Sequence, residues 1–344
     1  MKKDIKSMLP EELAEYFKSI GERNYRAGQV FRWLHSGAKD FREMTNLPEM
    51  LRERLDEGFF ITVPVILEKQ ISEQDGTIKH LWRMDDGNTV ESVVMEYEHG
   101  HTVCISTQVG CRMGCVFCAS ALGGLARNLT ASEMLDQILF TQMDIGIRLS
   151  NVVLMGIGEP LDNFDNVVRF LSIINHPSGM NVGARHITLS TCGIIENIDK
   201  LAEYGIQLSL AVSLHAPDDE TRSRLMPINR KTGVDELFRA CGRYFKSTGR
   251  RISYEYALID GVNDTQGHAE LLAGKIIATG SHLNLLLLSD VPESRINAST
   301  PENLKAFTGI LKTNGVPFTI RRKLGSDIDA SCGQLRRREV SARD

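Results

Sequence analysis

Three cysteines within the eight-residue stretch 111–118 have the spacing needed to bind one inorganic centre. Three residues separate Cys111 from Cys115, and two separate Cys115 from Cys118. Structural zinc takes four ligands, and a four-iron cluster usually takes four thiolates. Three thiolates therefore leave one iron of a cluster open, and an open metal position is typical of a catalytic site. The alternative is three buried free thiols, since thiols also pack as small apolar groups.

Two further segments carry the polar and glycine residues that line binding sites. Residues 155–160 read Met-Gly-Ile-Gly-Glu-Pro, where the glycines let the backbone approach a ligand and Glu159 can accept from an ammonium group. Cys332 lies in a glycine-flanked polar stretch, whereas a structural cysteine more often lies in an apolar run. An accessible thiol can act as a nucleophile when its thiolate is stabilised.

Basic residues bracket Cys332 on both sides, and they are Arg321, Arg322, Lys323, Arg336, Arg337 and Arg338. Together they could favour the thiolate form of Cys332 and could also bind phosphate groups. The alternative is a solvated tail, since runs of charge often have no ligand.

The bulk properties are those of a globular protein, and they argue against a membrane-spanning protein, a secreted protein and a disulfide scaffold. The chain has 344 residues, 42% hydrophobic and 24% charged, which suits one large domain with a smaller one. It carries no apolar run long enough to span a bilayer and no apolar leader after Met1, so we expect a cytoplasmic protein. Seven cysteines in a reducing compartment favour a metal site or catalysis over a disulfide scaffold. The net charge of −4 means that any RNA contact must come from local basic surface.

Hydrophobic periodicity predicts three regions along the chain. Residues 1–58 read as helices, residues 61–98 as extended strands, and strands alternate with helices from about residue 101. The expected strands of this last region cover 102–107, 151–155, 186–191, 207–213, 252–259, 282–288 and 316–321. Strands spaced by crossover helices predict a parallel sheet, and six such units suit a partial barrel better than a closed eight-fold one.

The candidate groups gather where the predicted parallel strands end, as catalytic groups do in such folds. The cysteine loop follows the first strand, Glu159 follows the second, and Ser190 and Ser213 end the third and fourth. Serines in such places are also common as turn residues. Glu91 lies in an otherwise apolar strand, where it could simply face solvent.

Bases and aromatics mix in the N-terminal region, as an RNA-contacting surface would, and they are Tyr25, Arg26, Gln29, Arg32 and Trp33. From these residues alone, an amphipathic packing helix is the favoured interpretation.

The chain resembles the RlmN/Cfr radical S-adenosylmethionine (SAM) RNA methyltransferases over nearly its whole length, and more closely the RlmN branch. The matching segments occur in the family's order: the three-cysteine loop, Gly-Ile-Gly158-Glu-Pro, Leu-Ser190-Thr, Ser213-Leu-His-Ala-Pro, Leu-Met-Pro-Ile-Asn229 and Asp329-Ala-Ser-Cys332-Gly-Gln-Leu. The resemblance implies a partial (β/α)6 radical SAM barrel, a small helical N-terminal domain that contacts RNA, and a short β extension. It divides the chain into 1–60, 61–96 with Glu91, 97–327, and 328–344 with Cys332.

The same resemblance implies the chemistry. One [4Fe-4S] cluster on Cys111, Cys115 and Cys118 and two SAM molecules per turnover would methylate adenine C2 in 23S rRNA, and in some members also in tRNA. Cys332 would take a methyl group from the first SAM. The second SAM would yield a 5′-deoxyadenosyl radical, which removes hydrogen from that methyl group so that its carbon adds to the ring.

Further roles also come from the resemblance. Cys104 would then release the product through a transient disulfide with Cys332. Glu91 would be the proton acceptor of the reaction, and this role replaces the interpretation that its side chain faces solvent. SAM contacts are implied for Gly158, Glu159, Ser190, Ser213, Leu214, His215 and Ser289. Ser289 departs from the family pattern, since the usual residue is an asparagine with a longer reach and an amide.

The resemblance further implies a flavodoxin- or ferredoxin-type electron donor, and we expect a monomer that binds no membrane. Two alternatives stay open. One is a Cfr-like C8 methyltransferase that gives ribosomal antibiotic resistance, and the other is a non-catalytic RNA-binding protein that carries zinc.

Overall fold

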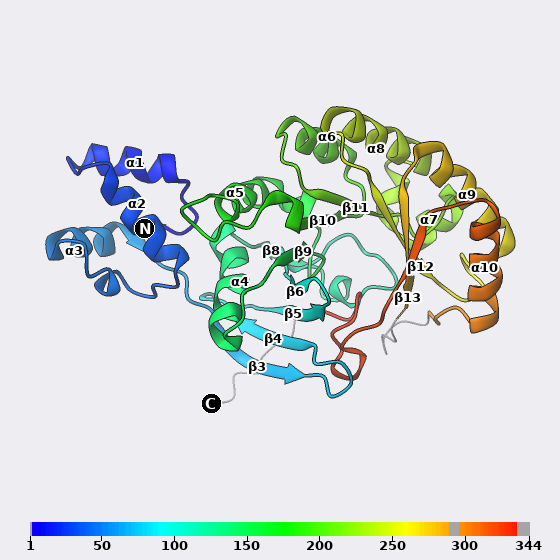
Figure 1. The fold of residues 1–344 in the computed structure, drawn as a ribbon, viewed down its shortest axis with the longest axis horizontal. Helices are drawn as coiled ribbons and strands as arrows, with labels where there is room; N and C mark the ends of the chain where they lie inside the picture. The colour runs from blue at the N-terminus through cyan, green and yellow to red at the C-terminus, as the bar shows by residue number, and fades with distance from the viewer. Residues whose placement is uncertain (1, 289–295, 336–344) are drawn as a thin grey trace.

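The computed structural model describes residues 2–288 and 296–335 (Figure 1). Ser289 therefore lies outside the described residues, and so do Arg336, Arg337 and Arg338.

The N-terminal region is helical, as predicted, and lies to one side of the main sheet (Figure 1). Its helices are α1 (Pro10–Ser19), α2 (Tyr25–His35) and α3 (Glu49–Gly58), with the 3-10 turn η1 (Phe41–Glu43) between the last two. Pro10 occupies the first turn of α1, and the Glu12 carboxylate accepts from the Leu9 backbone N–H at 2.8 Å, which defines where the helix begins. The short parallel strands β1 (Lys3–Asp4) and β2 (Phe59–Phe60) join the two ends of this region.

A buried ion pair couples this region to the rest of the chain. The Lys6 and Asp136 side chains are both fully buried, and Lys6 Nζ lies 2.5 Å from Asp136 Oδ1. Lys6 also donates to the Thr62 carbonyl oxygen at 2.7 Å, and the Thr62 hydroxyl donates to Asp136 Oδ2 at 2.5 Å. Each charge is thus compensated in a dry environment, which makes the loss of either one costly.

We expect Lys6→Met to lower the free energy of unfolding by about 3–5 kcal/mol, because it leaves the Asp136 charge buried without its cation. Urea denaturation followed by circular dichroism measures this loss. The double variant Lys6→Met/Asp136→Leu removes both charges and should recover most of it. A double variant no more stable than Lys6→Met would contradict this explanation.

Seven parallel strands form the barrel wall in the described residues, in chain order from β6 to β14. They are β6 (Gly100–Cys104), β9 (Asn151–Leu154), β10 (Ile187–Thr191), β11 (Ser209–Ser213), β12 (Ser253–Leu258), β13 (His282–Leu287) and β14 (Phe318–Arg321). The crossover helices lie on the outer face of this wall (Figure 1). They are α4 (Ala131–Ile145), α5 (Phe164–Ile174), α6 (Ile195–Glu203), α7 (Asp219–Leu225), α8 (Val234–Thr248), α9 (Gln266–Thr279) and α10 (Pro301–Thr313). The predicted partial barrel is confirmed.

Side-chain caps explain where several of these helices begin. Thr130 and Glu133 form a capping box at the start of α4, in which the Glu133 carboxylate accepts from the Thr130 N–H at 2.9 Å. Thr300 caps α10, and Pro301 fills its first position. Because these caps fix the entry of each helix, they also fix the loops that precede it.

An antiparallel β extension continues the barrel wall, so that one sheet holds ten strands within the described part of the chain. It consists of β3 (Val65–Ile71), β4 (Ile78–Arg83) and β5 (Thr89–Tyr97), and β5 pairs antiparallel with β6. The sequence predicted that the extended region begins at residue 61, but the first of these strands begins at Val65. The start is later because Pro64 has no N–H to donate to a ladder. The boundaries of the four predicted segments stay a prediction.

Three-residue and four-residue elements complete the described chain: β7 (Gln108–Gly110), β8 (Leu125–Asn128), η2 (Ala119–Ala121), η3 (Pro160–Asn163), η4 (Ala184–His186), η5 (Pro227–Arg230) and η6 (Ser326–Ile328). Across the residues described, no helix combines the length and the apolar character that crossing a bilayer requires.

Candidate active site

Two adjoining cavities open at the carboxyl ends of the barrel strands. The first, here called the cluster cavity, is lined by Cys111, Cys115 and Cys118 together with groups from the ends of β9 to β13. The second, here called the thiol cavity, is lined by Cys104 and by side chains of β5. Cys332 and Cys118 line both cavities, so the two cavities share a wall that includes these residues. The structure brings these five cysteines to the two cavities from three separate segments, which are the 111–118 loop, the end of β6 and the segment around Cys332.

Backbone contacts define the loop that carries the three cysteines. Gly110 has φ +77°, and a Cβ there would lie 1.9 Å from the Gly124 carbonyl oxygen, so only glycine lets the two ends of the loop approach. The Cys111 N–H donates to that same carbonyl at 3.0 Å, and the Cys118 N–H donates to the Cys115 carbonyl at 3.2 Å. The loop is therefore closed by its own backbone.

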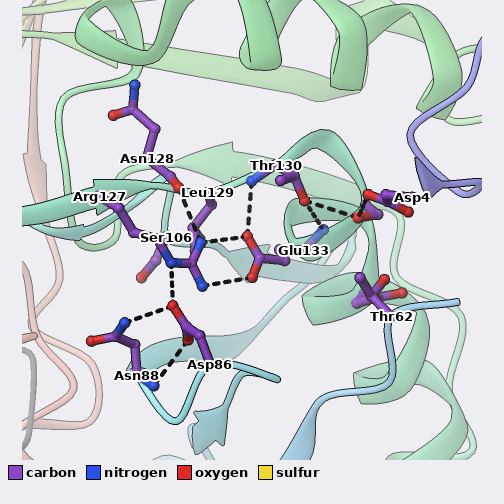
Figure 2. A network of polar contacts seen from close by, with 12 residues as sticks. Asp4, Thr62, Asp86, Asn88, Ser106, Arg127, Asn128, Leu129, Thr130 and Glu133 are labelled. Atoms are coloured by element: carbon purple, nitrogen blue, oxygen red, sulfur yellow. Dashed lines mark hydrogen bonds and ion pairs between the residues drawn. The ribbon is translucent and has the colours of Figure 1, made fainter. Parts of the chain in front are cut away.

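Arg127 anchors the chain just after this loop. Figure 2 shows its guanidinium between the carboxylates of Asp86, in the β4–β5 turn, and Glu133, in the first turn of α4. The Arg127–Asp86 contact measures 2.5 Å, and two contacts to Glu133 measure 2.8 Å each. The hydrogen bonds from Arg127 hold the pKa of the Asp86 carboxyl well below its usual range. This charge network fixes β8 against both the β extension and the barrel.

The three loop cysteines fit a cluster by their chemistry. Burial raises the pKa of the Cys111 thiol to about 12 and raises the pKa values of Cys115 and Cys118 as well. Positive iron would compensate three thiolates that the protein alone does not. Among residues 2–288 and 296–335, no group of three His, Cys, Asp or Glu side chains has an arrangement that could hold a single metal ion. All three cysteines line one cavity, which suits a four-iron cluster in which each thiolate binds a different iron.

Five of the seven predicted SAM contacts line the cluster cavity, and they are Gly158, Glu159, Ser190, Ser213 and His215. Gly158 has φ +111°, and a Cβ there would meet the Gln108 side chain at 2.7 Å, so glycine is required. Leu214 does not line the cavity, since its side chain packs in the core, and its carbonyl oxygen accepts from Arg222. Ser289 is not described.

Glu159 and His215 have defined partners at the mouth of the cavity. The Glu159 carboxylate accepts from the Leu161 N–H at 3.0 Å and the Cys192 N–H at 2.7 Å, while burial raises its pKa. His215 accepts from the Ala257 N–H at 2.9 Å through Nδ1, and burial lowers its pKa to about 3. His215 is thus neutral, with its proton on Nε2. It also packs against the Phe117 ring, which explains the aromatic residue before Cys118.

The sequence missed a buried arginine that binds the ends of two strands together. Arg222 is 1% exposed and donates to the carbonyl oxygens of Cys192, Ser213 and Leu214 at 2.7–3.0 Å, and to Asn229 Oδ1 at 2.8 Å. It fixes the ends of β10 and β11, where the cavity groups sit. The residues around it in α7 are polar, so no hydrophobic pattern marked it for burial.

The thiol cavity brings together the two cysteines that lie outside the cluster loop. Cys104 ends β6 and is buried, whereas Cys332 is exposed. Burial, aided by the neighbouring Cys332, raises the pKa of the Cys104 thiol to about 12, so it is protonated at neutral pH. Both are free thiols, as are the other five cysteines, and the predicted disulfide finds no support in this structure. A transient bond between them stays a prediction.

Glu91 does not face solvent, because it is 1% exposed on β5. Its side chain points to the same face as Val93, Met95 and Tyr97, which line the thiol cavity. Lys79 Nζ lies 3.8 Å from Glu91 Oε1. The carboxylate therefore lies on the cavity side of the sheet, although it is not itself part of the lining.

The N-terminal bases and aromatics lie on α2 and largely contact one another. The Arg26 guanidinium packs over the Tyr25 ring at 5.0 Å and donates to Gln29 Oε1 at 3.0 Å. The Trp33 indole N–H donates to Asn46 Oδ1 at 2.8 Å, and Arg32 is exposed. Contact of these residues with RNA stays a prediction.

Comparisons with known proteins agree with this architecture. The family model of the radical SAM superfamily matches residues 105–272, and the model described as the ribosomal RNA large subunit methyltransferase N-terminal domain matches residues 3–61. A crystal structure of a radical SAM methyltransferase from Sphaerobacter thermophilus superposes with a TM-score of 0.91 at 42% identity, covering 97% of this chain and 99% of that one.

Curated relatives match over nearly the full length. A protein of Alkaliphilus metalliredigens named "Probable dual-specificity RNA methyltransferase RlmN" is 49% identical over 98% of this chain and 96% of its own. A Clostridium tetani protein of the same name is 46% identical over 96% and 95%. With both cavities, the three-cysteine loop and the N-terminal domain in place, the chain belongs to the RlmN family of radical SAM RNA methyltransferases.

Proposed function

We propose that this protein methylates carbon C2 of an adenine in 23S rRNA, and also in tRNA, and that Cys332 carries the methyl group. The observation that carries the proposal is the position of Cys332 in the wall shared by the cluster cavity and the thiol cavity. A sulfur at that junction can face SAM on one side and a nucleobase on the other. The name "dual-specificity" given to the relatives supports two classes of RNA substrate.

Two cofactors are implied by the lining of the cluster cavity. Cys111, Cys115 and Cys118 would hold the cluster, which would supply the electron that cleaves SAM. Gly158 and Glu159 would hold the amino acid part of SAM, with Ser190, Ser213 and the neutral His215 along the same wall. The Glu159 carboxylate can accept from an ammonium group beside its two backbone partners.

The chain's own residues would carry the methyl transfer and the release. The Cys332 sulfur would attack the SAM methyl carbon, and the thioether sulfur of S-adenosylhomocysteine would leave with the electron pair. Glu91 would accept the proton lost from C2 of the methylated ring. Cys104, after its buried thiol loses a proton, would then attack the Cys332 sulfur. A disulfide forms as the bond between that sulfur and the transferred carbon breaks, and the carbon keeps the electron pair and takes up a proton as the product leaves. A thiol reductant would return both cysteines to the free form.

The electron donor, the contact of Ser289 with SAM, the oligomeric state and the compartment are proposed from the resemblance to the family. A flavodoxin- or ferredoxin-type protein would supply electrons, Ser289 would contact SAM, and the protein would act as a monomer in the cytoplasm. The exposed bases of the N-terminal domain, such as Arg32, would contact the RNA backbone.

Nucleoside analysis of RNA from a deletion strain tests the proposed reaction. We expect 2-methyladenosine to disappear from both 23S rRNA and tRNA of the deletion strain, and to return when the gene is restored on a plasmid. Mass spectrometry with synthetic standards separates methylation at C2 from methylation at C8. Restoration of 8-methyladenosine would instead establish the C8 reaction, and unchanged nucleosides would refute both.

A further inference from the structure

A hairpin turn of the β extension grips the loop that carries Cys332. The turn joins β3 to β4 through residues 72–77, and the loop covers residues 324–335. Asp75 Oδ2 accepts from the Gly325 N–H at 2.9 Å. In the opposite direction, Asp327 Oδ1 accepts from the Ser72 hydroxyl at 2.8 Å, and Asp327 Oδ2 accepts from the Glu73 N–H at 3.1 Å. The turn and the loop therefore each supply one carboxylate, which accepts hydrogen bonds from donors of the other segment.

Close packing accompanies these hydrogen bonds. Gly325 has φ +64°, and a Cβ there would lie 2.8 Å from the Thr77 methyl group and 2.7 Å from the Ala330 Cβ. Any larger residue would strain the backbone and push the loop away from the turn. Lys79, in β4, adds a further contact to this loop by donating to the Asp329 carbonyl oxygen at 3.3 Å. Its ammonium group also faces Glu91, so one strand touches both the loop and the proposed base.

The other end of the loop is held by the cysteine loop. The Ala119 N–H donates to the Gly333 carbonyl at 2.8 Å, and the Ser120 hydroxyl donates to the Leu335 carbonyl at 2.6 Å. Both donors directly follow Cys118. Cys332 thus lies between two attachments, one to the β3–β4 turn and one to the segment beside the cluster.

We propose that the β3–β4 turn positions Cys332, and that Asp75 and Asp327 are the positioning residues that hold its sulfur between the two cavities. The inference rests on the proposed role of Cys332 as methyl carrier and gives the β extension a part in the reaction. Neither carboxylate touches substrate or cofactor; each acts through the backbone of the loop. Cys332 takes a methyl group from SAM in one step and passes its carbon to the adenine ring in the other. Each step needs the group on Cys332 aligned with its reaction partner, so a displaced loop slows both.

The double variant Asp75→Ala/Asp327→Ala tests the proposal in the full-length protein after cluster reconstitution. We expect about 10- to 100-fold slower RNA methylation, because a displacement of about 1 Å has effects of that size. The fraction of Cys332 that carries a methyl group, measured by peptide mass spectrometry, should fall as well. Iron content and the visible absorption of the cluster should be unchanged, since neither residue lines the cluster cavity.

Three further variants keep the outcome clear. Glu73→Gln removes a neighbouring charge but leaves the Glu73 N–H in place, so it should behave as wild type. Asp75→Asn retains one oxygen that can accept from Gly325 but loses the second oxygen, which accepts from the Thr77 N–H, so it should keep more activity than the double variant. Gly325→Ala should reproduce the defect without any change of charge, and it also serves if the double variant fails to fold.

Wild-type methylation rates in a folded, iron-loaded double variant would overturn the proposal. A defect of equal size in Glu73→Gln would also overturn it, because charge rather than contact would then be responsible. If wild-type protein never carries a methyl group on Cys332, the proposed function itself is wrong. The rate at which iodoacetamide alkylates Cys332 then still decides the positioning role, since a released loop should react faster than a fixed one and an unchanged rate would refute it.

Discussion

Cys332→Ala is expected to abolish RNA methylation while the protein still binds its iron and SAM. Cys332 lines both cavities, and no other cysteine among the described residues does so except Cys118, which is assigned to the cluster. Without a sulfur at this place, the methyl group of SAM has no acceptor, because the adenine ring carbon is a poor nucleophile. The loss should exceed about 10³-fold, as when a covalent nucleophile is removed. Incorporation of label from methyl-labelled SAM into RNA measures it.

Cys104→Ala provides the matched control for this result. It removes the second thiol of the same cavity but leaves the methyl acceptor in place. We therefore expect Cys104→Ala to accept a methyl group on Cys332 and to accumulate protein–RNA crosslinks, whereas Cys332→Ala should form none. Methylated RNA from Cys332→Ala would show that the methyl group does not pass through this residue.

Cys115→Ala is expected to lose both the iron and all methylation. Each of the three loop cysteines would bind a separate iron, so two remaining thiolates cannot hold the cluster firmly. Anaerobic purification should give a brown wild-type protein with about four iron atoms per chain and a nearly colourless variant. A colourless wild-type protein that contains zinc would instead support the non-catalytic alternative.

Cys192→Ala is the matched control for the cluster ligands. Cys192 lies in the same cavity and is buried, but its backbone N–H, which donates to Glu159, is retained in alanine. We expect this variant to keep its iron and most of its activity. Loss of iron in Cys192→Ala would mean that the cluster takes a fourth thiolate, and the open position proposed for SAM would be excluded.

The sequence was informative about the site because parallel strands bring their carboxyl ends to one edge. Cys118, Glu159, Ser190 and Ser213 each follow or end a predicted strand, and all four line the cluster cavity. The alternation of strands and helices was enough for the partial barrel. Local patterns therefore predicted both the parallel sheet and the edge of the sheet at which the candidate groups lie.

Other features depend on contacts that no local pattern encodes. Leu214 belongs to the same short motif as Ser213 and His215, yet it packs in the core because neighbouring residues point in different directions. Glu91 was placed only by resemblance, since alternation along a strand does not reveal which face is covered. The contact between Asp75 and Gly325 joins residues 250 positions apart, a pairing that the folded chain alone determines.

The position of Cys332 in the wall between the two cavities has a consequence for the order of events. If Cys332 serves SAM on one side and RNA on the other, the enzyme must alternate between an empty and a loaded form, as in ping-pong kinetics. S-adenosylhomocysteine, the product of the first half-reaction, can then leave before RNA arrives. An enzyme loaded in advance would complete one round on RNA with a single further SAM molecule, so its first turnover and its later ones would draw on different numbers of SAM molecules.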